Sequence, residues 1–205
     1  LAHAAGPSDC TTAVCLEGAP ESVLQTAVMA EMAQYYGLPC VSAGCLSDAK
    51  SPGPQAAMEK VVTTLPLLLS GTDIINGFGC LEGSQVLMLE QIVVDNEIAG
   101  ICDRLVRGVE VSDEKDFFDD IARTGPGGHF LKAKNTRAAA RGAEFHRPAL
   151  LDRNPVEKWR ELGCPDMYEK ANEKVKEILS RPHPNPISDD TRGKLMDILA
   201  RAEEK

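Results

Sequence analysis

The alternation of short apolar segments with helical patterns over residues 11–78 limits the fold of this chain more than any other feature. Three apolar segments of strand length occupy residues 11–16, 39–44 and 73–78. Amphipathic helical patterns fill the two intervals, at residues 21–36 and 55–70, and only a few residues connect one segment to the next. This spacing predicts consecutive βα units around a parallel sheet.

The later part of the chain is predicted to be mainly helical. Helical patterns occur at residues 85–109, 112–123, 155–162, 165–180 and 188–204. Ser112 is a suitable helix N-cap, and the glycines and proline of residues 125–128 form a firm break. Pro66 lies inside the second helical pattern, where it predicts a kink or an early end. We divide the chain into later βα units with their following helices, 1–150, and a helical C-terminal extension, 151–205, which caps the fold or contacts another copy.

Two fold classes are compatible with this pattern. A parallel barrel needs eight strands in roughly 250 residues, whereas this chain of 205 residues has only two or three predicted βα units. The chain is either a small open α/β domain or the later part of a barrel whose first strands lie outside it. The residue pattern alone does not decide between them. Leu1 stands where an initiator Met would, which indicates that the chain begins inside a longer protein.

Composition argues against several functions. With 22 basic and 31 acidic side chains, the formal net charge is −9, which argues against a general binder of nucleic-acid backbones. No run of about 18 apolar residues predicts a membrane-spanning helix, and the N-terminal residues lack the pattern of a signal peptide. Seven cysteines are an odd number and too sparse for a secreted disulfide framework. We therefore expect a cytoplasmic protein that contacts neither nucleic acid nor membrane.

Three groups of residues resemble a known family. The first is Tyr35-Tyr36-Gly37-Leu38-Pro39 with Ser47-Asp48-Ala49-Lys50 and Gln55-Ala56-Ala57-Met58-Glu59-Lys60; the second is Leu89-Glu90-Gln91-Ile92-Val93-Val94-Asp95-Asn96-Glu97-Ile98-Ala99-Gly100; the third is Gly125-Pro126-Gly127-Gly128-His129-Phe130-Leu131. Together they resemble the trimethylamine methyltransferase family over about residues 8–180. The second half of the second group and the whole third group are fairly specific to that family.

The resemblance implies both a fold and a reaction. Members of the family are longer (β/α)₈ barrels, so this chain would be the C-terminal portion of such a TIM barrel with a helical C-terminal extension. They pass a methyl group from a methylated amine to the Co(I) of a corrinoid, cobalamin, which a cognate corrinoid protein carries. No cofactor is therefore expected to bind tightly to this chain itself, and a homo-oligomer is expected.

The resemblance also bears on the amine. Trimethylamine enzymes carry pyrrolysine inside the barrel, whereas relatives without it demethylate quaternary amines such as glycine betaine. We place the corresponding strand end near Gly44-Cys45, where this sequence has an ordinary residue, and this favours a quaternary amine. A quaternary ammonium leaves as a neutral amine and needs no general acid, so the protein mainly supplies positioning and electrostatics. The family's basic run after the third group is altered here, to residues 132–137.

The candidate catalytic residues are Asp48, Lys50 and Glu82. Reacting residues of a barrel come from the carboxyl ends of its strands, which here are predicted at residues 15–18, 43–50 and 78–82. Asp48 and Lys50 match the family pattern, and their structural alternative is a salt bridge within the loop. Glu82 has the charge to hold a cation, and its alternative is a solvated loop acid or a charge at a helix N-terminus.

The candidate substrate-binding residues are Glu17, Cys45, Phe78 and His129. Glu17 would hold the positive charge of the amine. The ring of Phe78 would add a cation–π contact of about 0.5–2 kcal/mol, unless the residue simply packs in the core. His129 follows two glycines, where it would lie at the barrel mouth or contact the corrinoid protein; its alternative is to fix a tight turn.

Several other residues and functions complete the sequence-based expectations. Asp95 and Glu97 lie two residues apart on a predicted helix and so on different faces. One is expected to face solvent and the other to pair with an arginine such as Arg104. Two functional alternatives stay open: a non-catalytic or assembly fragment of a barrel, and a zinc-dependent corrinoid methyltransferase. For the zinc alternative, each cysteine pair encloses four residues, the wide end of zinc-ligand spacing, and lacks a matching His pair, so no metal ligands are assigned.

Overall fold

A parallel sheet forms the N-terminal part of the molecule. The computed structural model describes residues 2–3, 6–182 and 185–203. Over these residues the sheet has the strand order β1 (Ala2–His3), β2 (Val41–Ala43) and β3 (Ile74–Asn76). All of its pairings are parallel, which confirms the parallel arrangement that the sequence predicts for the segments at 39–44 and 73–78.

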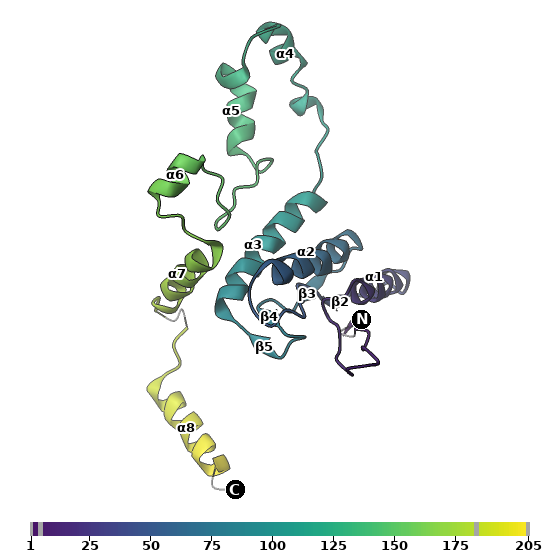
Figure 1. Ribbon diagram of the computed structural model, residues 1–205, viewed down its shortest axis with the longest axis vertical. Coiled ribbons are helices and arrows are strands. Elements are labelled where there is room, and N and C mark those ends of the chain that lie inside the picture. Colours follow the sequence, from purple (N-terminus) through teal and green to yellow (C-terminus); the bar gives the residue numbers. More distant parts are fainter. Residues whose placement is uncertain (1, 4–5, 183–184, 204–205) are drawn as a thin grey trace.

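Two helices provide the crossover connections of this sheet. α1 (Pro20–Tyr35) leads from β1 to β2, and α2 (Pro54–Leu69) leads from β2 to β3, with the helices packed side by side (Figure 1). Each begins with a proline, which suits the first turn because an N–H there has no partner within the helix. The early end expected at Pro66 is wrong. α2 continues to Leu69, and Leu67 beyond the proline is almost completely buried.

The strand predicted at residues 11–16 is a loop. Asp9 accepts hydrogen bonds from the backbone N–H and the hydroxyl of Thr11, so the side chain stabilises a turn in place of a strand. A single antiparallel bridge between Ser8 and Cys15 is the extended pairing in this region. The strand that precedes α1 is β1 instead, and the predicted strand end at residues 15–18 belongs to the loop between β1 and α1.

The helix predicted from residue 85 begins four residues later than expected. Residues 80–87 form a small antiparallel hairpin of β4 (Cys80–Leu81) and β5 (Val86–Leu87). Glu82, Gly83 and Ser84 all have positive φ angles, so the chain reverses there instead of continuing into a helix. α3 then runs over Leu89–Val106.

An extended arm of short helices follows α3. The single helix predicted after Ser112 is divided into a 3-10 turn, Asp113–Lys115, and α4 (Phe118–Thr124). A second 3-10 turn, Phe130–Lys132, leads into α5 (Lys134–Arg141). In Figure 1 α4 and α5 lie at the top of the molecule, away from the sheet. α6 (Val156–Glu161) begins the return of the chain towards the core.

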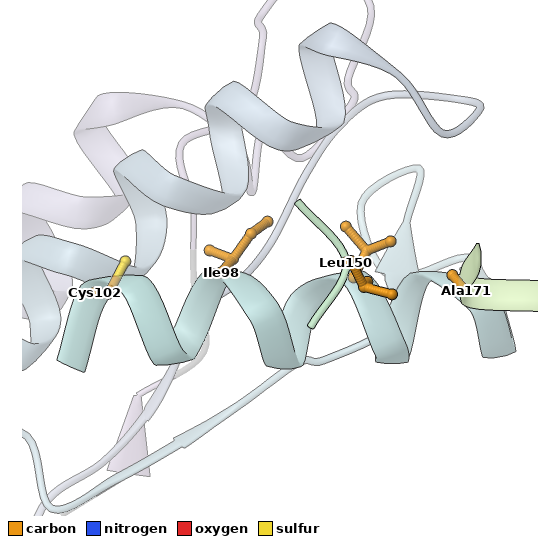
Figure 2. Packing of buried hydrophobic residues seen from close by; sticks show 5 residues of the cluster. Ile98, Cys102, Leu150 and Ala171 are labelled. Carbon is orange, nitrogen blue, oxygen red and sulfur yellow. The ribbon is translucent and has the colours of Figure 1, made fainter. Parts of the chain in front are cut away.

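The largest apolar cluster lies between α3 and α7 (Met167–Leu179). Figure 2 shows Ile98 and Cys102 on α3, with Leu150 from a loop and Ala171 from α7 beside the same helix. An N-terminal capping box, in which the side chains of Asp166 and Glu169 bond each other's backbone N–H, fixes the start of α7. Leu150 and Ala171 come from either side of residue 151 yet share this cluster. The division into 1–150 and 151–205 stays a prediction.

α8 (Asp189–Glu203) differs from the other long helices because none of its residues is buried. It lies at the lower end of the molecule in Figure 1, apart from the sheet. No helix within the described residues is both long and apolar enough to cross a membrane. The described chain is thus a helix-rich α/β arrangement around three parallel strands, and a closed barrel stays a prediction.

Candidate functional site

The loops that follow β2 and β3 meet at the carboxyl edge of the sheet. Residues 44–50 come directly after β2, and residues 77–82 come directly after β3. The backbone N–H of Glu82 donates to the carbonyl of Ala49, and that of Gly83 donates to Ser47. Because the carboxyl ends of parallel strands lie at one edge, these bonds hold two candidate loops together there.

Asp48 connects a third loop to this edge. Its Oδ1 accepts the backbone N–H of Glu17 at 2.9 Å, and its Oδ2 accepts that of Gly18 at 3.1 Å. Lys50 donates to the backbone carbonyl of Asp48 at 2.8 Å, so the alternative salt bridge between the two side chains is not formed. Asp48 therefore places Glu17 beside the strand ends, although its segment is not a strand.

Glu59 on α2 accepts hydrogen bonds from the same loop. One carboxylate oxygen accepts the hydroxyl of Ser47 at 2.7 Å and the backbone N–H of Asp48 at 2.9 Å. Partial burial favours the neutral acid, but hydrogen bonds from Ser47, Gln55 and the loop backbone outweigh it and lower the pKa of Glu59. The loop is thus hydrogen-bonded to an ionised carboxylate. A Cβ at Gly18 would lie 2.7 Å from that carboxylate and 3.0 Å from the backbone nitrogen of Asp48, so a side chain there would have to displace Glu59.

A cavity of about 290 Å³ opens between the first two helices and the strand ends. Its lining mixes apolar groups, hydroxyls and one carboxylate: Glu17, Ser22, Val23, Thr26, Ala43, Leu46, Thr63, Leu67, Asn76, Gly77 and Ser84. Ser84 from the β4–β5 turn donates its hydroxyl to Oε2 of Glu17. Oε1 makes no hydrogen bond within the part of the chain that the structure describes. A single carboxylate in a cavity of this size suits a small organic cation.

Glu82 and Phe78 lie at the same edge but outside the lining of this cavity. Both are half-buried. Glu82 has a φ of 54°, and among the described residues its carboxylate has no hydrogen-bond or ion-pair partner. Their predicted contacts with a cation stay predictions.

Cys45 is the first side chain after Gly44 at the end of β2, and it is fully buried. Burial, and next the negative charge of Asp95, raise the pKa of its thiol to about 12. The thiol is therefore neutral at ordinary pH, which makes it a weak nucleophile and metal ligand. The backbone of Cys45 has a φ of 54°, a conformation that non-glycine residues rarely adopt. Substrate contact by this residue stays a prediction.

Sequence reasoning missed the most buried charge of the site, Lys60. Its Nζ donates to the carbonyls of Cys45 at 2.7 Å and Cys80 at 2.8 Å, and to Oδ2 of Asp95 at 2.8 Å. The side chains of Lys60 and Asp95 are both completely buried. No local signal in the sequence pointed to it, because the face of α2 that carries Lys60 also carries Thr63 and Thr64, whereas apolar residues such as Met58 and Val62 are exposed.

The expectation for Asp95 and Glu97 is wrong. Neither faces solvent, because α2 and α7 both pack against α3. Oε2 of Glu97 accepts the backbone N–H of Ala149 at 2.9 Å and of Leu150 at 3.3 Å. Arg104 instead forms its ion pair with Glu144. Both acids instead bond the backbone or a buried lysine inside the fold.

His129 is separated from the other six candidates. It is exposed and precedes the 3-10 turn Phe130–Lys132, which packs against α4 and α5 in the arm. Its role at a barrel mouth or a protein contact stays a prediction. Across the described residues, no three His, Cys, Asp or Glu side chains lie close enough to hold a metal ion.

Comparison with known proteins identifies similar chains. The model of the trimethylamine methyltransferase family matches residues 9–205. A trimethylamine methyltransferase MttB of Methanosarcina barkeri strain Fusaro is 37% identical over 187 residues, which are 91% of this chain and 37% of that protein. An MttB of Methanosarcina thermophila is 38% identical over 84% of this chain and 35% of its own length. A glycine betaine methyltransferase of Desulfitobacterium hafniense strain Y51 is 30% identical over 90% of this chain and 38% of its own. The chain thus spans little more than a third of these relatives.

Proposed function

This chain belongs to the trimethylamine methyltransferase family, and we propose that the complete protein transfers a methyl group from a methylated amine to a corrinoid on a cognate partner protein. The similarity to proteins named for trimethylamine and for glycine betaine supports the methyltransferase reaction. We also propose that β1, β2 and β3 are consecutive strands of a (β/α)₈ barrel, because parallel strands with intervening helices are its repeating unit.

The observation that carries the amine part of this proposal is the cavity beside Glu17. A methylated ammonium is a cation with an apolar surface, and the cavity offers one carboxylate among apolar groups and hydroxyls. Only one oxygen of Glu17 is engaged, by Ser84, so the other is available to face a positive charge. The half-buried position of Glu17 strengthens such an attraction relative to bulk water.

The residues of this chain have positioning and electrostatic roles in the proposed reaction. The corrinoid supplies the nucleophile, Co(I), and the amine leaves as a neutral molecule if it was quaternary. Glu17 holds the ammonium, and Asp48 holds the backbone of Glu17. Glu82 and the ring of Phe78 add negative potential at the same edge, while Lys50 steadies the loop that contains Asp48.

We assign the substrate to the quaternary class. Cys45 lies at the strand end that we align with the pyrrolysine of the trimethylamine enzymes. Its thiol is neutral and buried, so it offers no means to activate a tertiary amine. The partner is a corrinoid protein docked over the carboxyl edge of the strands. Among the described residues, no group of His, Cys, Asp or Glu side chains favours the zinc-dependent alternative.

The test is a methyl-transfer assay with the complete protein. Reduced corrinoid protein is mixed with glycine betaine, other betaines or trimethylamine, and methylation of cobalt is followed by absorbance. We expect signal with a betaine. Signal with trimethylamine alone would overturn the quaternary assignment and leave the methyltransferase proposal standing. No signal with any methylated amine would overturn both.

Glu17→Gln tests the cation site directly. Loss of the charge should weaken amine binding about tenfold, equivalent to about 1.4 kcal/mol, which lies between the values for a charge pair in water and near a protein surface. Calorimetric titration with glycine betaine measures the affinity. The control is Glu21→Gln, an exposed acid in the first turn of α1 that does not line the cavity. Equal effects of the two variants would contradict a specific role for Glu17.

A further inference from the structure

Lys60 is buried at the junction of the two loops that form the candidate site. An ammonium group has three N–H donors, and all three are used: by the carbonyl of Cys45, the carbonyl of Cys80 and the carboxylate of Asp95. Cys45 lies in the loop after β2, and Cys80 lies in the segment after β3. One side chain from α2 therefore fixes the backbone of both loops.

Asp95 is held as firmly as its partner. Besides Lys60, Oδ2 accepts the backbone N–H of Gly79 at 2.6 Å, and Oδ1 accepts the side-chain amide of Gln91 at 2.6 Å. Gln91 in turn accepts the hydroxyl of Tyr168 at 2.9 Å. A continuous chain of hydrogen bonds thus runs from α7 through α3 and α2 to the strand ends.

This arrangement is costly if its purpose is only to stabilise the fold. Removing two charges from water is unfavourable, and apolar side chains of similar volume often serve as well or better. An apolar pair could not fix the orientation of the two loop carbonyl groups. Hydrogen bonds from Lys60 can, because a carbonyl oxygen accepts at a preferred distance and angle. Direction matters here, since Cys45 and Glu82, in the two loops, both have positive φ angles, which nothing in their residue type favours.

We propose that Lys60 is a positioning residue for the proposed methyl transfer, which fixes the loops after β2 and β3 through the carbonyls of Cys45 and Cys80. Asp95, Gln91 and Tyr168 keep Lys60 in place. The inference rests on the proposed function for its consequence in activity, but its effect on the loop backbone does not depend on that function.

The test compares variants of the complete protein. Lys60→Met leaves Asp95 buried without its counter-charge and is expected to impair folding. The main variant is therefore Lys60→Met with Asp95→Asn, which is neutral and keeps one carbonyl acceptor for the backbone N–H of Gly79. We expect its turnover at saturating amine to fall about 10- to 100-fold, as for a small misplacement of reacting groups. Tyr168→Phe, at the far end of the chain of bonds, should lower it by a few fold.

Asn172→Ala is the matched control for Tyr168→Phe. Asn172 also bonds α7 to α3, through Glu90, but that bond does not lead to Lys60. Turnover of this variant should stay close to that of the unaltered protein. If it falls as much as that of Tyr168→Phe, the effect comes from docking of α7 in general, and the proposed chain of positioning residues is overturned.

A second readout separates positioning from overall stability. Alkylation by iodoacetamide, followed peptide by peptide by mass spectrometry, should accelerate at Cys45 in the double variant, whereas Cys102, equally buried between α3 and its neighbours, should stay protected. Equal acceleration at both thiols, or unchanged alkylation and turnover, would overturn the inference. If the unaltered protein transfers no methyl group, the proposed function fails, and the two thiols still decide whether Lys60 positions the loop.

Discussion

Single carboxylates organise the candidate site, and they do so through backbone N–H groups. Asp48 accepts from Glu17 and Gly18, Glu59 accepts from Asp48, and Asp95 accepts from Gly79. Each acid thereby helps to fix a loop, together with backbone hydrogen bonds between the loops. Negative charges are concentrated where a cation is proposed to bind, and most of them are already engaged in holding the backbone. Glu17 and Glu82 differ, because among the described residues one oxygen of Glu17 and the carboxylate of Glu82 are not engaged in this way.

Asp48→Ala tests the first of these contacts. Two backbone N–H groups lose a charged acceptor, so the free energy of unfolding should fall by about 1–3 kcal/mol. Urea unfolding followed by circular dichroism measures the change. Asp48→Asn keeps one carbonyl acceptor and should lose less. A loss of equal size in both variants would show that the geometry of the two bonds is not what matters.

The lowered pKa of Glu59 predicts a pH dependence of stability. Its folded-state pKa lies below the ordinary value of a glutamate side chain, which is the value expected in the unfolded chain. Glu59 therefore contributes stability that is present above that value and is lost as the pH falls through the folded pKa. Glu59→Gln should have a lower urea midpoint than the unaltered protein at about pH 6 and lose less of it on acidification to about pH 3.

The control for Glu59 is Glu31→Gln, at an exposed position of α1 with no described hydrogen-bond partner. This variant should follow the unaltered protein over the whole pH range. A Glu59→Gln protein whose stability falls with acid as steeply as the unaltered one would contradict the role given to the ionised carboxylate.

Close packing between elements explains why glycine stands at the end of β2. A Cβ at Gly44 would lie 2.7 Å from Ile75 of β3, 2.8 Å from Leu67 and 3.0 Å from the Thr63 carbonyl of α2. Distances below 3.0 Å require these neighbours to move. A side chain at Gly44 would therefore push α2 or β3 away. The glycine allows α2, and with it Lys60, to lie close to the strand ends.

Gly44→Ala should accordingly destabilise the protein by about 1–3 kcal/mol, the usual range for overpacking in a core. Gly193→Ala is its control, because a Cβ there meets nothing within 4 Å in the middle of α8. That variant should be neutral or gain up to about 1 kcal/mol from helix propensity. Thermal unfolding of the two proteins distinguishes the cases, and similar changes of the same sign would refute the packing argument.

At the scale of elements, sequence patterns predicted the helices better than the strands. α1 and α2 lie within two residues of their expected bounds, because an apolar stripe with proline or glycine at its ends is a local signal. The prediction of a strand at residues 11–16 was wrong because a segment this short can also form a turn. The hydrogen bond from Thr11 to the Asp9 side chain stabilises the turn here. The hairpin at residues 80–87 was missed because positive φ angles at Glu82 and Ser84 follow from no residue preference.

Across the whole molecule, α7 and α8 differ in how they join the rest. α7 shares the cluster of Val94, Ile98 and Leu150, whereas α8 buries no residue. Ending the chain at Arg181, which removes α8, should therefore leave the free energy of unfolding unchanged within about 0.5 kcal/mol. Ending it at Asp166 removes Ala171 and Tyr168 as well and should destabilise it strongly. Chemical denaturation of both truncated proteins measures their free energies of unfolding. A large decrease on removing α8 alone would contradict the view that α8 adds nothing to the core.

The candidate residues show how far sequence reasoning reached towards the site. It named Glu17, Asp48 and Glu82 as groups at strand ends, and the structure brings their loops to one edge, although for Glu17 by way of Asp48 and not by a strand. It gave no role to Lys60, and it placed His129 with the others although the structure separates them. Their contributions to catalysis stay predictions.

Local order along this chain, meaning where helices begin and which segments alternate with them, follows from residue types a few positions apart, because helix periodicity and turn preferences act over that distance. The meeting of Lys60 with Asp95, 35 positions away, depends on how α2 and α3 pack. No local pattern contains that information, since a buried lysine is unfavourable until folding brings it an acid and two carbonyl groups. The sequence thus indicates which residues lie at the carboxyl edge of the strands. Their geometry depends on the packing of helices that are distant in the sequence.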